Sequence, residues 1–387
     1  MRLTRLAGCR KKCFMASINI LHTEWSDGWG GQEIRILDEC LGLSERGHRV
    51  ELAGCPRGKL RLRAEAAGLV FHPLDMAGAW DLAACLGLFR LIRRRGVRIV
   101  HTHSSVDSWL GGMAARLAGA ACVRTRHLSA PVNTSLMNFV YRLPQAVITT
   151  GQGIRRHLVK DYGLPAARVL SIPTGVDLTR FKPCEPDPSL QAELGLSPGE
   201  PVVAIVAVLR SWKRHDLFCD MAKMVLERRP ATRFLIVGHG PGWERVGGYL
   251  DQMNLRPAAL MTGHRDDIER ILPLCTVCVL PSDKNEGVPQ AVLQELACER
   301  AVVGAAAGDI PEVVRDGQTG LLVAAGQAPP LAEAVLRLLD DESLRRELGR
   351  RGRAFVSENY SREIMLSRTE AVYERVLAGQ PPGENVL

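Results

Sequence analysis

Residues 282–296, SDKNEGVPQAVLQEL, are the most informative stretch of this chain. They follow an apolar run at 277–280 that Pro281 closes, so the sequence predicts a buried strand, then a loop, then an amphipathic helix. In an open α/β sheet, ligands bind where strands end and loops begin. Glu286, followed by Gly287 and the backbone amides of a helix start, suits a ligand that carries both hydroxyls and phosphate. Taken alone, the segment fits equally well a loop whose acid only caps the helix.

The length and composition indicate two globular domains. At 387 residues the chain is too long for one ordinary core, and 46% hydrophobic with 24% charged residues is typical of folded proteins. Aromatic residues make up only 5%, which argues against a stacking platform for single-stranded nucleic acid, so we expect no nucleic-acid partner. The formal charge is +8, of which residues 1–14 carry five; the remainder is ordinary for a protein that binds phosphorylated ligands.

The first residues allow two interpretations. Charges interrupt residues 1–14, which lack the apolar core of a signal peptide. They form either a disordered basic arm that touches anionic lipid, or an extension upstream of a working start at Met15, which we favour. No run of 18 or more apolar residues is present, and eleven cysteines without a framework spacing indicate reduced thiols. We expect a cytoplasmic protein, with peripheral contact to the inner face of the cytoplasmic membrane if the arm binds lipid.

Strand and helix patterns alternate through both halves of the chain, which predicts an α/β fold with parallel sheets covered by helices on both faces. Five prolines from Pro183 to Pro201, counting both ends, mark the expected domain boundary. We therefore expect a basic extension at 1–16, a first domain at 17–182, a second domain at 183–360, and a terminal helix with a tail at 361–387. The expected strands are 18–21, 49–52, 98–101, 122–125, 147–149, 202–208, 233–237, 259–262, 277–280, 301–305 and 320–323, and the expected helices 32–46, 82–94, 109–117, 216–228, 291–298 and 363–377.

Four further strings are informative: DGWGGQE at 27–33, RH at 126–127, IPTGVD at 172–177, which closes the first domain, and AVLRSWKRH at 207–215. Together with residues 282–296, they resemble the motifs of retaining glycosyltransferases with the GT-B architecture, family 4 in the sequence classification. The resemblance covers nearly the whole chain. It implies two Rossmann-like domains that face each other across a cleft, the first on the acceptor side and the second binding a nucleotide-sugar. It also implies that the terminal helix crosses back to the first domain.

The resemblance implies catalytic roles for four residues. His127 would hydrogen-bond the donor sugar, and Glu286 would orient the sugar hydroxyls. Lys213 would grip the diphosphate. Val208 stands at the family's arginine position, so we expect Arg210, two residues later, to supply the second cation.

Further residues are expected to contact the donor or its nucleotide. Gln294 stands where the family has a second acid, and its amide can still hydrogen-bond the ribose hydroxyls. Glu295 cannot simply replace that acid, because adjacent helix residues point about 100° apart. The other expected contacts are Gly30, Gly31, Gly238, Gly240, Arg265, Gly287, Val288 and Pro289.

The sequence predicts an enzyme that needs no metal or other cofactor. It has no Asp-x-Asp pair of the kind that holds a divalent ion against a diphosphate, and His101 and His103 have no third ligand that the sequence identifies. A strict Gly-x-Gly-x-x-Gly is absent, which disfavours NAD. The expected activity is transfer of a sugar from a nucleotide-sugar to a glycan or lipid-linked acceptor in bacterial cell-surface polysaccharide or lipopolysaccharide synthesis. A nucleotide-sugar 2-epimerase of the same fold and a non-catalytic nucleotide-sugar-binding protein are the alternatives.

Overall fold

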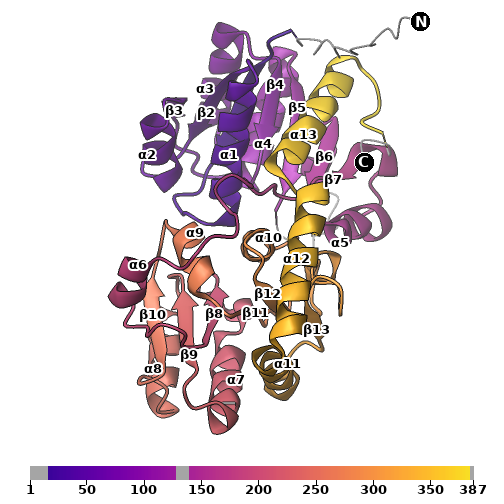
Figure 1. The fold of residues 1–387 in the computed structure, drawn as a ribbon. Coiled ribbons are helices and arrows are strands. Elements are labelled where there is room, and N and C mark those ends of the chain that lie inside the picture. Colours follow the sequence, from indigo (N-terminus) through magenta and orange to yellow (C-terminus); the bar gives the residue numbers. More distant parts are fainter. Residues whose placement is uncertain (1–15, 128–138, 384–387) are drawn as a thin grey trace, which may run out of the picture.

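The computed structural model describes residues 16–127 and 139–383, and these form two β-sheets with helices on both faces (Figure 1). The first sheet has seven parallel strands in the spatial order β3-β2-β1-β4-β5-β6-β7. Its strands are β1 (Asn19–Glu24), β2 (Arg49–Gly54), β3 (Val70–Pro73), β4 (Ile99–Thr102), β5 (Ala121–Arg126), β6 (Ala146–Thr149) and β7 (Val169–Ser171). Its helices are α1 (Gly31–Glu45), α2 (Lys59–Ala66), α3 (Leu82–Arg95), α4 (Val106–Ala118) and α5 (Gln152–Arg156), with short turns η1 (Phe139–Tyr141), η2 (His157–Asp161) and η3 (Ala166–Arg168).

The second sheet has six parallel strands in the order β10-β9-β8-β11-β12-β13. Its strands are β8 (Val202–Val206), β9 (Arg233–Val237), β10 (Ala259–Gly263), β11 (Val277–Leu280), β12 (Ala301–Ala305) and β13 (Leu321–Val323). The remaining helices are α6 (Pro188–Glu193), α7 (His215–Arg228), α8 (Trp243–Gln252), α9 (Ile268–Ile271), α10 (Gln290–Ala297), α11 (Ala328–Asp340), α12 (Glu342–Asn359) and α13 (Arg362–Leu377), with turns η4 (Ser211–Lys213), η5 (Leu272–Leu274) and η6 (Ile310–Glu312). The expected α/β class with parallel sheets is confirmed. The domain boundary at residue 183 stays a proposal.

Each sheet separates two apolar cores, as alternation along a strand requires. In β1, Ile20 packs into the core beneath α1, α2 and α13, whereas its neighbour Leu21 packs into the core beneath α3 and α4. Helices α3 and α4 end at Gly96 and Gly119, whose φ values of 61° and 75° place them in the left-handed region that ends helices. The result is a first sheet with α3 and α4 together on one face and α1, α2 and α13 on the other.

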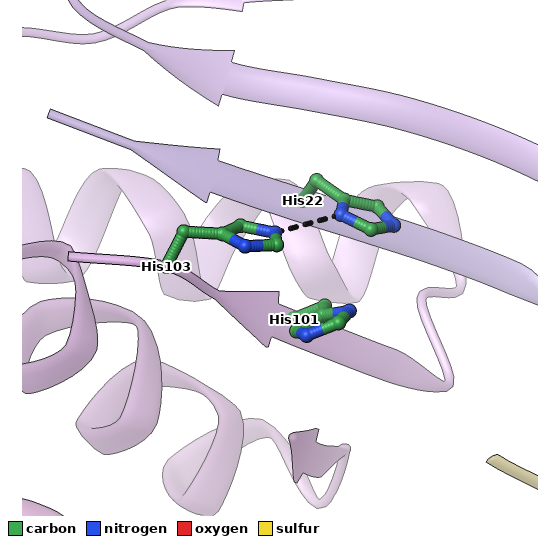
Figure 2. Close-up of side chains that lie close together, drawn as sticks. All are labelled: His22, His101 and His103. Carbon is green, nitrogen blue, oxygen red and sulfur yellow. Dashed lines mark hydrogen bonds between the residues drawn. The ribbon is translucent and has the colours of Figure 1, made fainter. Parts of the chain in front are cut away.

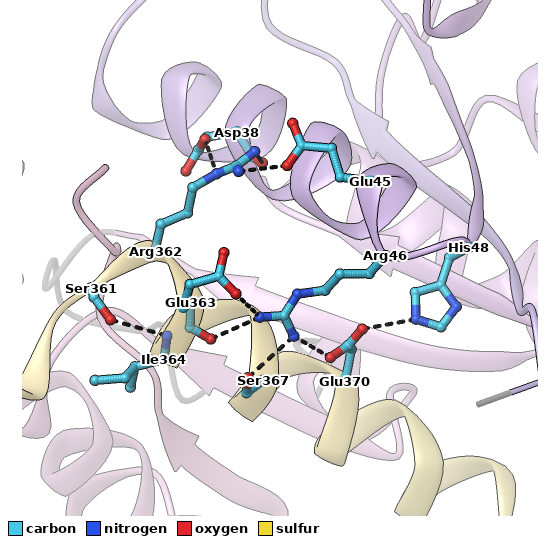
Figure 3. Close-up of polar contacts among 10 residues, drawn as sticks. All are labelled: Asp38, Glu45, Arg46, His48, Ser361, Arg362, Glu363, Ile364, Ser367 and Glu370. Atoms are coloured by element: carbon cyan, nitrogen blue, oxygen red, sulfur yellow. Dashed lines mark hydrogen bonds and ion pairs between the residues drawn. The ribbon is translucent and has the colours of Figure 1, made fainter. Parts of the chain in front are cut away.

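The last helix, α13, returns to the first sheet and packs beside α1 (Figures 1 and 3). Its apolar side belongs to the core of that sheet, with Tyr373 fully buried. At its start, the Arg362 side chain donates to Asp38 and to Glu45 of α1, each at 2.7 Å (Figure 3). Arg46, at the end of α1, forms ion pairs with Glu363 and Glu370 of α13. The contact therefore combines a buried apolar face with ion pairs that fix its register.

The sequence analysis missed several elements and extended one too far. It missed β3, which is only four residues long and ends in a proline, and β7, which has three residues. It missed α12, in which eight of the 18 residues are charged and few side chains are buried. The strand expected at 202–208 ends at Val206, because the Val208 carbonyl accepts from the Arg210 N–H in a turn and Leu209 bonds the loop after β9. Within the described residues, no helix is long and apolar enough to span a bilayer. The extension expected at 1–16 lies, except for its last residue, outside the described residues.

Candidate active site

Lys213 and Glu286 form an ion pair at the carboxyl edge of the second sheet. Lys213 ends η4 after β8, Glu286 lies in the loop after β11, and these strands are neighbours. The Lys213 Nζ is 2.7 Å from Glu286 Oε1 and 2.9 Å from Oε2. Glu286 is only 5% exposed, and its backbone carbonyl accepts a hydrogen bond from the N–H of Asp309 at 3.1 Å. The structure thus brings together two of the four predicted catalytic residues.

The loop that carries Glu286 also touches the first sheet. The Val288 N–H donates to the carbonyl of Thr150, directly after β6, at 3.0 Å. A side chain at position 287 would meet the Thr150 Oγ1 at 2.4 Å, so only glycine fits there. The Thr150 hydroxyl in turn donates to the carbonyl of His127 at 3.2 Å. A short backbone path therefore connects His127 in the first sheet with the Glu286 loop in the second.

A second contact between the sheets lies beside the first. The backbone N–H groups of Gln152 and Gly153, at the start of α5, donate to Glu312 and Asp309, each at 2.6 Å. Burial, together with the neighbouring Asp309, raises the pKa of Glu312 to about 8. The carboxyl edges of both sheets, where open α/β folds bind ligands, therefore meet in these loops.

His127 is the end of a row of three hydrogen-bonded histidines. His103 Nδ1 lies 3.2 Å from His127 Nε2, and His103 Nε2 lies 2.9 Å from His22 Nδ1 (Figure 2). His22 is fully buried on β1, and His103, which follows β4, is 3% exposed. Burial lowers the pKa of His22 to about 3 and also lowers the pKa of His103, so both rings are neutral at neutral pH. Since each neutral ring donates through one nitrogen and accepts through the other, the protonated nitrogen of His127 depends on the tautomer of His103, which in turn depends on that of His22.

His22 is the functional candidate that the sequence analysis missed. It stands opposite His101 in the parallel pairing of β1 with β4, so aligning the two strands would have found it. His22, His101 and His103 offer ligand atoms within 4.8 Å of one another, a spacing that admits a metal ion. However, His101 already uses both ring nitrogens, on Tyr373 Oη at 2.6 Å and on Thr125 Oγ1 at 2.7 Å. A metal would have to break this satisfied pairing, so the trio fits a hydrogen-bonded core better than a metal site.

The glycine-rich loop before α1 faces the second sheet. The Gly30 N–H donates to Glu33 Oε2 at 2.8 Å, and the Ser26 hydroxyl donates to the other oxygen of the same carboxylate. This pairing orders the loop and starts the helix. A Cβ on Gly31 would lie 3.7 Å from the Gln290 Oε1 at the start of α10. Gly30 and Gly31 therefore lie where the first sheet approaches the Glu286 loop.

Gly238 and Gly240 have a reason to be glycine that is independent of any ligand. Gly238 has a φ of 141°, and a Cβ there would meet the carbonyl of Ala207 at 2.0 Å. A Cβ on Gly240 would meet the backbone N of Leu209 at 2.8 Å. The loop after β9 is thus packed against the loop that leads to Lys213. Contact of these glycines with a nucleotide stays a prediction.

Two predicted cations, Arg265 and Arg210, are less well placed than Lys213 for contact with the diphosphate of a donor. The Arg265 guanidinium is held by Asp267 at 2.7 Å and by Glu193 at 2.6 Å, and these hydrogen bonds raise its pKa. It would have to leave both carboxylates to reach a donor. Arg210 is exposed, and its guanidinium lies 5.2 Å from the centre of the Trp212 ring. Its backbone carbonyl accepts from the Lys213 N–H at 3.1 Å, so it shares the loop but shows no side-chain contact with the Lys213–Glu286 pair.

Helix α10 carries Gln294, at the position of the family's second acid, and its neighbour Glu295. Pro289 precedes the first turn of α10, Gln294 is half-buried, and Glu295 is buried. Burial raises the pKa of Glu295 to about 8, with Lys213 acting in the other direction. That Glu295 does not replace the family's acid stays a prediction. Among the described residues, the Gln294 amide has no intramolecular hydrogen-bond partner.

Two surface cavities lie far from these loops. One of about 400 Å³ is lined by residues before β8, β11 and β12, and the other, of about 490 Å³, by residues before β4 and β5. Both therefore open at the amino ends of strands, the edge that open α/β folds do not use for their main ligand. The carboxyl edge remains the candidate site.

Comparison with known proteins decides the family. Residues 29–180 match the family model described as Glycosyltransferase Family 4, and residues 200–341 match the model described as Glycosyl transferases group 1. The chain is 30% identical over 279 residues to UDP-Gal:alpha-D-GlcNAc-diphosphoundecaprenol alpha-1,3-galactosyltransferase of Escherichia coli, which covers 68% of this chain and 72% of that protein. The chain belongs to glycosyltransferase family 4. It is accordingly an enzyme that uses a nucleotide-sugar donor, as the sequence predicted.

Two more comparisons extend the match to the whole chain. The family 4 chain is 26% identical over 366 residues to N-acetyl-alpha-D-glucosaminyl L-malate synthase of Bacillus anthracis, covering 88% of this chain and 93% of the relative. The crystal structure of the Anabaena protein HepE in complex with UDP-glucose superposes with a TM-score of 0.82 at 18% identity, covering 94% of this chain and 100% of that one. The GT-B architecture of two parallel sheets is therefore confirmed for this glycosyltransferase. The roles of individual site residues stay proposals.

Proposed function

We propose that this family 4 enzyme transfers a hexose from a UDP-sugar to a hydroxyl of a lipid-linked glycan, with retention, during assembly of a bacterial cell-surface polysaccharide. Two comparisons support the donor: the E. coli relative is named for UDP-Gal, and the HepE structure holds UDP-glucose. The E. coli relative also supports the acceptor, since its name specifies a diphosphoundecaprenol-linked sugar. The B. anthracis relative is named for a product that contains L-malate instead, so the acceptor is the point that needs a direct test.

The observation that carries the proposal is the Lys213–Glu286 pair. Negative charge develops on the diphosphate as the sugar leaves, and a fixed cation beside it is a large catalytic contribution. A lysine ammonium has three donors, so Lys213 can hold Glu286 with one or two and a phosphate oxygen with another. Glu286, fixed in this way, would accept hydrogen bonds from the sugar hydroxyls. Arg210, on the same exposed loop, would add a second cation once the donor is bound.

Residues of the first sheet would complete the site. His127 would hydrogen-bond the sugar from the opposite side, because Thr150 ties its backbone close to the Glu286 loop. The loop at Gly30 and Gly31 would approach the phosphates through its backbone N–H groups. The leaving phosphate would accept the proton of the attacking hydroxyl. In this scheme the residues of the chain hold and orient both substrates and exclude water, with no metal.

A panel experiment tests this function. Thermal shifts with UDP-, GDP-, ADP- and dTDP-sugars identify the donor, and release of nucleotide with and without lipid-linked acceptors identifies the reaction. We expect stabilisation by UDP-sugars and nucleotide release that depends on the acceptor. Turnover of the sugar without any acceptor would indicate the 2-epimerase, and donor binding without nucleotide release for any acceptor would indicate a non-catalytic binding protein. Mass analysis of the product then gives the acceptor.

A further inference from the structure

The outward face of α3 and α4 combines exposed apolar side chains with arginines, and on α3 the exposed leucines precede the arginines along the helix. On α3, Leu82 and Leu86 are 80% and 46% exposed, and Arg90 and Arg93 follow at spacings of four and three. Residues at these spacings share one helix face. On α4, Met113 and Leu117 are 38% and 67% exposed, with Arg116 beside them. We call these residues, with Trp80 before α3, the α3/α4 face.

The apolar end of the α3/α4 face carries an aromatic pair. Trp80 is 74% exposed, and its ring stacks on Trp109 of α4 at 6.1 Å between centroids. Trp109 also meets Phe139 edge-on at 4.6 Å. Tryptophan rings have an apolar body with one polar N–H and are enriched where a protein meets the lipid headgroup region. Large apolar side chains exposed together in this way mark an interaction surface.

The charge on this part of the chain is strongly one-sided. Residues 82–126 contain eight arginines, no lysine and one acid, for a net formal charge of +7. The acid, Asp107, is buried and accepts hydrogen bonds from the N–H groups of His103 and Ser104. Five of the arginines are exposed, and in the described part of the chain none of the five has a carboxylate within ion-pair distance: Arg90, Arg93, Arg94, Arg98 and Arg116.

We infer that the α3/α4 face docks this protein on an anionic lipid bilayer. Each arginine near such a surface is attracted by the negative potential of the lipids, while leucine and tryptophan side chains enter the headgroup region. A nucleic acid would use the arginines but would leave Leu82, Leu86 and Leu117 uncovered. The inference concerns a surface outside the active site, and it does not depend on residues 1–14, which lie outside the described residues.

One end of the α3/α4 face lies next to the candidate active site, so docking on a bilayer would bring that site close to the lipids. The apolar end lies at the starts of α3 and α4, next to the carboxyl edge of the first sheet, where His103 and His127 are found. The basic end lies at the opposite edge, where Arg98 and Arg116 line the cavity of about 490 Å³. A bilayer lying along the face would therefore meet the carboxyl edge, where a lipid-linked acceptor would arrive. This consequence alone rests on the proposed function.

Vesicle co-sedimentation of the full chain tests the inference. The vesicles contain phosphatidylcholine alone or phosphatidylcholine with phosphatidylglycerol, each at low and at high salt. We expect binding to the anionic vesicles only, weakened by salt. The combined change Arg90→Gln with Arg93→Gln should lower the fraction bound by at least about tenfold. Leu82→Ser should weaken binding several-fold at every salt concentration, because its contribution is apolar.

Matched variants serve as controls. Arg337→Gln with Arg350→Gln removes two exposed charges from α11 and α12, and Leu62→Ser removes an exposed leucine from α2, on the other side of the first sheet. Neither should change vesicle binding. Equal loss in the test and control variants, equal binding to neutral vesicles, or nucleic-acid binding that outcompetes the vesicles and ignores Leu82→Ser would overturn the inference. Affinity for UDP, measured by calorimetry, should be the same in all variants; failure of UDP to bind would contradict the proposed function and leave the docking result intact.

Discussion

Lys213 Nζ lies 2.7 Å from Glu286 Oε1, so the proposed diphosphate cation and the proposed sugar-orienting acid form an ion pair. The pair joins the loops after the neighbouring strands β8 and β11. Glu286 is nearly buried, so it depends on Lys213 for its compensating charge. The same contact therefore has a structural role beside its proposed catalytic role, and a single substitution cannot separate the two.

Lys213→Ala should lower turnover by on the order of 3 kcal/mol in the barrier, roughly a hundredfold, because the leaving diphosphate loses a cation. It should also lower the melting temperature, since Glu286 is left nearly buried without a partner. Adding Glu286→Gln should recover much of the melting temperature but none of the turnover. Lys223→Ala, an exposed cation on α7, is the matched control. Near wild-type nucleotide release by Lys213→Ala would remove this residue from the mechanism.

Glu295 gives a stability prediction with a defined pH window. Burial raises its pKa from 4.5 to about 8, so between these values the folded chain keeps a proton that the unfolded chain has released. Glu295 thus makes the folded state progressively less stable as pH rises from 4.5 to about 8. Glu295→Gln removes this dependence. The melting temperature of the variant, relative to that of the wild type, should therefore rise as pH rises from 4.5 to about 8. Glu227→Gln, on the exposed side of α7, controls for loss of an acid. A difference that stays constant with pH would show that Glu295 is ionised in the fold.

His103 should act through His127 and not by contact with the donor. His103→Leu breaks the hydrogen bonds of 3.2 Å to His127 and 2.9 Å to His22, leaving the orientation and tautomer of His127 unfixed. If His127 binds the donor sugar, affinity for the UDP-sugar should fall roughly fivefold to tenfold, the worth of about one hydrogen bond. Affinity for UDP, which has no sugar, should not change. His103→Gln, which can still donate and accept, should recover part of the loss. An equal loss for UDP and UDP-sugar would assign His103 a purely structural role.

The sequence was sufficient for the parallel sheets and for the carboxyl-edge loops, because both follow from local patterns. Apolar runs give the strands, and Gly, Pro and single polar residues mark the ends of strands such as β11. It was not sufficient for partners that the fold brings together from distant segments. The pairing of Glu286 with Lys213, the position of Thr150 between His127 and Val288, and the ion pair of Arg265 with Glu193 depend on the packing of segments 23 to 138 residues apart. His22 was missed for the same reason, since only the β1–β4 pairing places it beside His101.

Gln294 offers the sharpest test of nucleotide binding. It replaces the second acid of the family motif, it is half-buried on α10, and its amide has no intramolecular hydrogen-bond partner among the described residues. If it binds ribose, Gln294→Leu should weaken UDP binding, because the ribose hydroxyls lose a partner when they leave water. Gln294→Glu should be tolerated and should tighten binding, since hydrogen bonds to a charged acceptor are worth roughly 1.5–3 kcal/mol against about 1 kcal/mol for neutral ones. Calorimetric titration with UDP isolates this contact from the sugar and the acceptor. Unchanged affinity in both variants would show that the ribose contact of the family has no counterpart at position 294.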